Sequence, residues 1–243
     1  MILRTAKKVL GVILDLAYPN ACVACGAPIA GFVALPLCAE CTVKAEFSGD
    51  MMCPRCGAGI RRDPEDVKKC PKCYDLQLNF RRAVSLAPYE KPLGEVVKAL
   101  KFRGYRHFAR PLAEYLAEVL RRRDFAQEID IIVPVPIHWR RKFSRGFNQS
   151  ELIARYLGTL LDIPVDRRSL RRTRDTKPQT KLSGAERLQN LKGAFKVRRP
   201  RAVEGKRILL LDDVMTTGGT MTECARELRR AGAKDIYAAV VAR

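Results

Sequence analysis

The sequence has no apolar run that approaches the roughly 20 residues needed to cross a membrane, which excludes a transmembrane protein. Acidic side chains are also scarce, because 26 Asp and Glu face 46 Lys and Arg, for a formal net charge of +20. This excess indicates an anionic partner, either nucleic acid or a phosphorylated small molecule. The hydrophobic fraction of 47 % can fill a core, and it excludes a disordered chain.

A convincing secretion signal is missing too. Basic residues near the start precede a short apolar run, but Asp15 interrupts that run, and residues 19–21 (PNA) before Cys22 make a poor lipid-attachment box. We therefore expect residues 2–18 to form an amphipathic helix on a cytoplasmic protein.

Cysteines divide the chain. Eight of the nine form four C-x-x-C pairs: Cys22, Cys25, Cys38, Cys41, Cys53, Cys56, Cys70 and Cys73. Such spacing lets one tight turn aim two sulfurs at a metal ion, and a second turn completes a tetrahedron. The peptide at 22–29 (CVACGAPI) recurs at 53–60 as CPRCGAGI. The repeat favours two consecutive zinc ribbons, one from the first four cysteines and one from the last four, although crossed pairing stays open.

Structural Zn²⁺ is the best interpretation of these cysteines. Four thiolates around each ion leave no open position for a reactive water. The alternatives are disulfides, which need a secreted context, and redox motifs, which would occur singly on a βαβ pattern. Residues 1–80 hold 10 Lys and Arg against 8 Asp and Glu, whereas residues 81–243 hold 36 against 18. We predict two units, a helix with a double zinc ribbon over 1–80 and a strongly basic domain over 81–243.

The second unit alternates apolar strands with amphipathic helices. Strands are predicted at 83–88, 130–135, 207–211 and 236–242, and helices at 92–102, from 111, from 149 and over 221–230. This pattern indicates an α/β fold with a parallel sheet covered on both faces. Ligands in such folds bind at the carboxyl ends of the strands.

The most informative segment follows the strand at 207–211. Asp212 and Asp213 suit the hydroxyls of a vicinal diol and are not expected in a core. Small residues then lead into a helix N-terminus, which is typical of a phosphate cradle. The cradle comprises Val214, Met215, Thr216, Thr217, Gly218, Gly219 and Thr220. Together the two parts predict a ribose 5-phosphate site.

Residues 208–220 resemble the phosphoribosyl-pyrophosphate (PRPP) motif of the type I phosphoribosyltransferases. With the cysteine ribbons, the chain resembles the ComF family of competence proteins. Further stretches that carry this resemblance are 100–104 (LKFRG), 145–149 (RGFNQ), 178–182 (PQTKL) and 193–195 (GAF).

The resemblance implies that Asp212 and Asp213 bind the ribose hydroxyls and that residues 214–220 bind the 5-phosphate. It also implies a loop after the strand at 130–135 that faces pyrophosphate or nucleic acid and carries Arg140, Arg141, Lys142 and Arg145. Mg²⁺ would bridge the pyrophosphate and the diol. Residues 171–187 are the candidate for a mobile cover over PRPP.

Three functions are compatible with these residues. The chain is a PRPP-dependent enzyme that transfers the pentosyl group to a nitrogen nucleophile, a single-stranded-DNA-binding protein of DNA uptake and the competence machinery, or a non-catalytic PRPP sensor. Trp139, Phe143 and Phe147 alternate with basic residues, which suits either stacking on the bases of a strand or anchoring the loop to the sheet.

Overall fold

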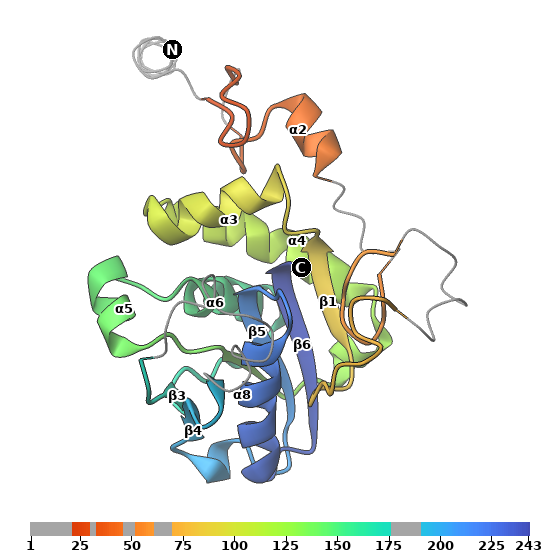
Figure 1. Ribbon diagram of the computed structural model, residues 1–243, viewed down its shortest axis with the longest axis vertical. Coiled ribbons are helices and arrows are strands. Elements are labelled where there is room, and N and C mark those ends of the chain that lie inside the picture. Colours follow the sequence, from red (N-terminus) through yellow and green to blue (C-terminus); the bar gives the residue numbers. More distant parts are fainter. Residues whose placement is uncertain (1–20, 30–32, 46–51, 61–69, 176–190) are drawn as a thin grey trace, which may run out of the picture.

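The computed structural model describes residues 21–29, 33–45, 52–60, 70–175 and 191–243 (Figure 1). Its centre is a four-stranded parallel sheet in the order β1-β6-β5-β2. The strands are β1 (Ala83–Ala87), β2 (Ile131–Pro134), β5 (Arg207–Val214) and β6 (Asp235–Ala242). All four predicted strands are therefore confirmed, and so is the α/β parallel-sheet fold.

β5 is longer than predicted. It was expected to end at Leu211, but Asp212 pairs with Val240 and Val214 pairs with Ala242 on β6. The two acids therefore belong to the strand itself rather than to the loop after it, because the neighbouring strand continues alongside them.

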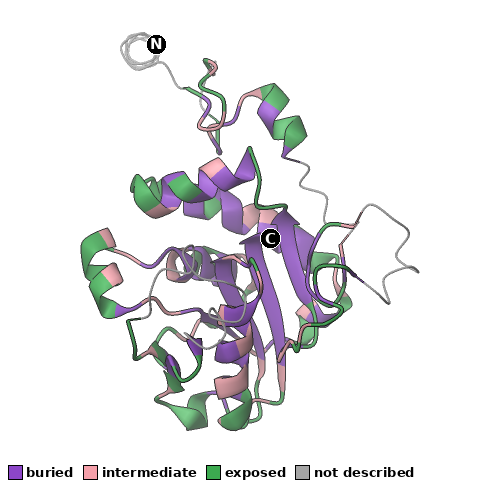
Figure 2. Ribbon diagram, in the orientation of Figure 1, coloured by how far each residue is buried: buried purple, intermediate pink, exposed green. Residues whose placement is uncertain are grey.

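Helices cover both faces of the sheet. The structure has α3 (Leu93–Phe102), α4 (Ala109–Arg121), α5 (Trp139–Arg145), α6 (Gln149–Leu161) and α8 (Gly219–Arg230), with short 3-10 helices at Arg106–Phe108, Asp124–Glu128 and Pro200–Ala202. Side chains of β5 alternate between the two faces, since Leu209 and Leu211 pack with α3, α4 and α6, whereas Ile208 and Leu210 pack with α8. Strands buried on both faces explain the continuous apolar runs of the sequence (Figure 2).

Two elements were not predicted. The segment after β2 was expected to be a loop, but it forms α5, a helix with no buried residues. An antiparallel hairpin of β3 (Leu170–Arg172) and β4 (Phe195–Val197) lies on the α8 side of the sheet. Both lack the apolar periodicity that identified the other elements, because α5 buries no face and the strands are short.

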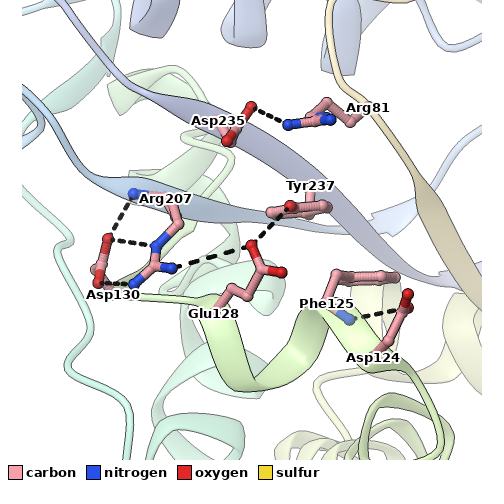
Figure 3. A network of polar contacts seen from close by, with 8 residues as sticks. All are labelled: Arg81, Asp124, Phe125, Glu128, Asp130, Arg207, Asp235 and Tyr237. Atoms are coloured by element: carbon pink, nitrogen blue, oxygen red, sulfur yellow. Dashed lines mark hydrogen bonds and ion pairs between the residues drawn. The ribbon is translucent and has the colours of Figure 1, made fainter.

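Ion pairs fasten the amino ends of the strands (Figure 3). Arg207 at the start of β5 donates two hydrogen bonds from its side chain to Asp130, just before β2, and Arg81 pairs with Asp235 at 2.9 Å. The ring of Tyr237 stacks on Phe125 with centroids 4.6 Å apart. These contacts fix the sheet at the end opposite to Asp212 and Asp213.

The two cysteine ribbons dock on the sheet domain at different places (Figure 1). The first includes helix α2 (Ala39–Lys44), and its Leu35 and Leu37 join the apolar core that contains α3 and α4. The second lies along β1, the edge strand. There the Ser85 hydroxyl donates to the Gly57 carbonyl at 2.6 Å, and the Ala83 amide donates to the Pro54 carbonyl at 3.3 Å. The second ribbon thus supplies partners for a strand edge that no other strand covers in the described part of the chain.

No helix in the described ranges is both long enough and apolar enough to cross a membrane.

Matched glycines test the docking of the second ribbon. Gly26 and Gly57 have φ values of +79° and +72°, but only at Gly57 would a Cβ meet backbone, 3.1 Å from the carbonyl carbon of Val84. A positive φ costs Ala about 1–2 kcal/mol at either site. We expect Gly57→Ala to lower the free energy of unfolding, measured by urea titration in excess zinc, clearly more than Gly26→Ala. Equal losses would contradict close docking on β1.

Candidate functional site

The eight cysteines form two tetrads in consecutive order, so crossed pairing is wrong. In each tetrad the four sulfur atoms lie within 4.8 Å of one another. The sulfur atoms of Cys25 and Cys38 lie 3.7 Å apart, and those of Cys53 and Cys73 and of Cys56 and Cys70 lie 3.9 Å apart. A tetrahedral Zn²⁺ with bonds of about 2.3 Å places its sulfurs about 3.8 Å apart. The donor sets therefore fit structural zinc.

The sheet has a topological switch between β2 and β5. After β2 and the exposed helix α5, α6 packs on one face of the sheet through Ile153 and Leu157. The helix after β5, α8, packs on the other face through Ala225 and Leu228. The chain thus leaves these neighbouring strands in opposite directions. In open α/β sheets, this is the position where ligands bind, and Asp212 and Asp213 lie there.

Asp213 pairs with Lys101 of α3, whose Nζ lies 2.9 Å from its Oδ2. Burial opposes ionisation of Asp213, but the charge and hydrogen bond of Lys101 outweigh it and lower the pKa of this carboxyl. Gln149 contributes a further hydrogen bond in the same direction. Asp213 is therefore a carboxylate at neutral pH.

Asp212 has a different environment. The Ser150 hydroxyl donates to its Oδ1 at 2.8 Å, and the backbone amide of Asp213 donates to the same atom at 2.9 Å. Burial, together with the negative charge of Asp213, raises the pKa of Asp212 to about 7. One member of the pair thus titrates near neutrality while the other stays charged, as expected for two close carboxylates.

Both acids are more buried than predicted. Asp212 is 8 % exposed and Asp213 is 3 % exposed, although two carboxylates at this position were not expected in the core. They can be buried because Lys101, Ser150 and Gln149 supply a charge and hydrogen-bond donors. None of these three residues was given a role by the sequence, although Lys101 and Gln149 lie in the stretches 100–104 and 145–149.

The stretch 145–149 builds the corner that places these donors. Gly146 ends α5 with a φ of +79°, and its amide donates to the Lys142 carbonyl. Asn148 caps α6 by accepting from the Ser150 amide at 3.1 Å, and its side-chain amide donates to the Val135 carbonyl at 3.0 Å. Asn148 thereby ties the start of α6 to the end of β2 and holds Ser150 against Asp212.

The four predicted basic residues separate. Arg145 donates to Gln149 at 2.6 Å, and the charge of Asp213 acts on it. Lys142 instead pairs with Glu151 at 3.0 Å, and Arg141 lies 3.8 Å from Asp175. The guanidinium of Arg140 stacks over the ring of Trp139, 5.4 Å from its centroid. All four lie on α5, but only Arg145, at its end, is directed toward the acid pair through Gln149.

Residues 214–220 divide between three elements. Val214 ends β5, Gly219 and Thr220 begin α8, and residues 215–218 connect them. The Met215 amide donates to the Ala242 carbonyl, and Gly218 has a φ of +80°. Within the described ranges, no acceptor meets the backbone amides of Thr216, Thr217, Gly218 or Gly219. Unpaired amides at the start of a 12-residue helix can bind an anion. We call residues 215–219 the phosphate loop.

Arg172 lies within the predicted cover at 171–187, but the structure places it in β3, where the charge of Asp212 acts on it. Its guanidinium stacks over Phe195 at 5.3 Å from the centroid. Burial lowers the pKa of Arg172, and the charges of Asp212 and Asp175 act on it in the opposite direction. The predicted helix at 2–18, and residues 176–187 of the predicted cover, lie outside the described residues.

Comparison with known proteins gives two domain matches. Residues 106–243 match the family described as "Phosphoribosyl transferase domain", and residues 13–74 match "Double zinc ribbon domain". The chain is 36 % identical over 221 residues to "DNA utilization protein YhgH" of Escherichia coli, covering 90 % of this chain and 94 % of that protein.

The chain is also similar to a second curated protein and, more weakly, to a solved structure. "Competence protein F" of Haemophilus influenzae is 29 % identical over 204 residues, covering 82 % of this chain and 87 % of that protein. A solved glutamine PRPP amidotransferase from B. subtilis is 25 % identical, with a TM-score of 0.37, and covers 54 % of this chain and 25 % of the amidotransferase.

Because burial and the charge of Asp213 raise the pKa of Asp212, the stability of the protein should depend on pH. The pKa of Asp212 is about 7 in the folded protein, against about 4 for an unfolded Asp. The contribution of this group to the free energy of unfolding is therefore full below about pH 4, falls as the pH rises from about 4 to about 7, and stays constant above that. We expect the melting temperature of wild type minus that of Asp212→Asn to fall between about pH 5.5 and pH 7.

Asp130→Asn is the control, because Arg207 lowers the pKa of Asp130 and this group stays ionised over that range. A difference for Asp212→Asn that is flat with pH would contradict the raised pKa.

Proposed function

Because the chain belongs to the ComF family, in which a double zinc ribbon precedes a phosphoribosyltransferase domain, we propose that it binds PRPP or another ribose 5-phosphate ligand at the carboxyl end of β5. The names of its relatives, which refer to DNA utilization and competence, support a role for this binding in the same processes. We place the protein in the cytoplasm, where cysteine thiols stay reduced.

The proposal rests on one juxtaposition: the phosphate loop, in which the amides of residues 216–219 have no acceptor among the described residues, follows the buried acid pair. The amides of Thr216 to Gly219 and the N-terminus of α8 would hold the 5-phosphate. Asp212 and Asp213 would accept hydrogen bonds from the ribose hydroxyls. The two groups of donors and acceptors match the two ends of a phosphorylated pentose.

Cations near the acid pair suit the pyrophosphate of PRPP. Lys101 pairs with Asp213, and the charges of the acids also act on Arg145 and on Arg172 of β3. Arg can contact two oxygens of a phosphate at once, which makes it the stronger candidate. Mg²⁺ bound to the pyrophosphate would neutralise part of its charge, and it takes phosphate and water ligands rather than a cage of carboxylates. Binding of the donor is proposed whether or not transfer to an acceptor follows.

Calorimetric titration with PRPP and Mg²⁺ tests the site. We expect Asp212→Asn combined with Asp213→Asn to weaken binding by about 100-fold, since hydrogen bonds to charged groups contribute about 1.5–3 kcal/mol each. Asp212→Asn alone should weaken it less and keeps the pair of Asp213 with Lys101 intact. Asp130→Asn, at the opposite end of the sheet, should bind as wild type does. Unchanged affinity in folded Asp212→Asn and in the double variant would remove the acids from the site.

Single-stranded nucleic acid is a second candidate ligand, favoured by the surface of α5. Trp139 is 66 % exposed and Phe143 is 89 % exposed, so these two rings do not anchor the segment to the sheet. Phe147, in contrast, packs against the core beneath the guanidinium of Arg106. An open hollow of about 450 Å³ is lined by Trp139, Lys142, Phe143 and Gly146. Exposed rings beside cations are typical of surfaces on which bases stack.

The β3–β4 hairpin extends this basic surface. Arg171 lies directly across from Lys196, and both are exposed. Like charges at opposite positions destabilise a hairpin, and neither side chain has an ion-pair partner among the described residues. A polyanion would relieve that repulsion. The hairpin lies close enough to α5 for the charge of Arg141 to act on Arg172.

The lone tryptophan, Trp139, allows a direct test of strand binding. A single-stranded oligonucleotide should quench its fluorescence, and Phe143→Leu should weaken that binding about tenfold, because stacking contributes about 1–3 kcal/mol per base. Tyr156→Leu, a partly exposed aromatic on α6, is the matched control. Equal affinities for all three proteins, or equal binding of duplex DNA, would argue against stacking on α5.

A further inference from the structure

A chain of contacts joins the second zinc ribbon to the phosphate loop. Arg243, which follows β6, donates from Nη1 to the Thr216 carbonyl at 3.2 Å and from Nη2 to the Lys72 carbonyl at 3.3 Å. Lys72 lies between the ligands Cys70 and Cys73, whereas Thr216 lies in the phosphate loop. One guanidinium therefore bridges the metal site and the proposed anion site.

A second connection runs through the segment that leaves the ribbon. Leu78 packs against both the cysteine cluster and the core that contains α8, and it is the nearest side chain to the Cβ position of Gly218, at 3.4 Å. Asn79 donates to the Thr222 carbonyl in the first turn of α8, and its own carbonyl accepts from Arg229. The second ribbon and the segment that follows it thus contact the phosphate loop and both ends of α8.

The bond to Thr216 has a specific consequence for the loop. In a trans peptide the C=O of one residue and the N–H of the next point in opposite directions. Because Arg243 holds the Thr216 carbonyl, it turns the Thr217 amide away from the guanidinium. That amide is one of the unpaired donors proposed to bind the 5-phosphate.

We infer that the second ribbon controls the anion affinity of the phosphate loop through Arg243, which acts as a positioning residue. Zinc bound by Cys53, Cys56, Cys70 and Cys73 would fix the Lys72 carbonyl and hence the guanidinium. The first ribbon does not share this role, since its apolar residues pack in the core with α3 and α4. This inference rests on the proposed ribose 5-phosphate site.

The test compares Arg243→Gln with Arg81→Gln, the same substitution at an ion pair on the far end of the sheet. Arg243→Gln should weaken binding of ribose 5-phosphate about tenfold, the size of one lost hydrogen bond at a charged group. It should also speed hydrogen exchange of the Met215 and Thr222 amides, whose hydrogen bonds bracket the loop. Melting temperature and zinc content should match those of Arg81→Gln.

One cysteine substitution in each ribbon distinguishes the effects of the two metal sites. Cys73→Ser should speed exchange of the same two amides, and Cys41→Ser should leave it unchanged. Equal exchange in Arg243→Gln and Arg81→Gln, or equal effects of the two cysteine variants, would overturn the inference while leaving the binding site standing. If the wild-type protein does not bind ribose 5-phosphate but hydrogen exchange is faster in Arg243→Gln, the proposed function is overturned. The link between the second ribbon and the phosphate loop would then still hold.

Discussion

Two adjacent carboxylates buried at the end of one strand repel each other, and the structure around them is organised to make this arrangement stable. A single lysine from α3 neutralises Asp213, and Ser150 from the start of α6 hydrogen-bonds Asp212. Each compensating group comes from a different helix. The packing of α3 and α6 on the sheet is therefore also what permits a pair of acids beside the phosphate loop.

Local patterns predicted the parts of the molecule whose chemistry is local. The cysteine spacing and its repeat predicted both tetrads, and the run at 208–220 predicted a strand, a tight loop and a helix in the right order. The partners of the acids could not be predicted in this way. Lys101 and Gln149 lie more than 60 residues before Asp213 in the sequence, and only the sheet topology brings them together.

Two elements that the sequence did not predict correctly, α5 and the end of β5, differ from the prediction for physical reasons. α5 presents both of its aromatic rings to solvent, so the apolar spacing that marks a packed helix is missing. The two acids extend β5 because β6 continues beside them, which is a property of the neighbouring strand rather than of the acids. Functional surfaces break the local rules on which such predictions depend.

The position of the second ribbon along β1 has a consequence for the protein without metal. On its outer side, β1 directs the amides of Ala83 and Ser85 to Pro54 and Met52 of the ribbon instead of to another strand. A ribbon that unfolds for want of zinc uncovers a parallel-sheet edge with apolar side chains on both faces. Such an edge is a template for a strand from another copy of the chain. Loss of zinc from this tetrad would then favour aggregation of the chain through the exposed edge of β1.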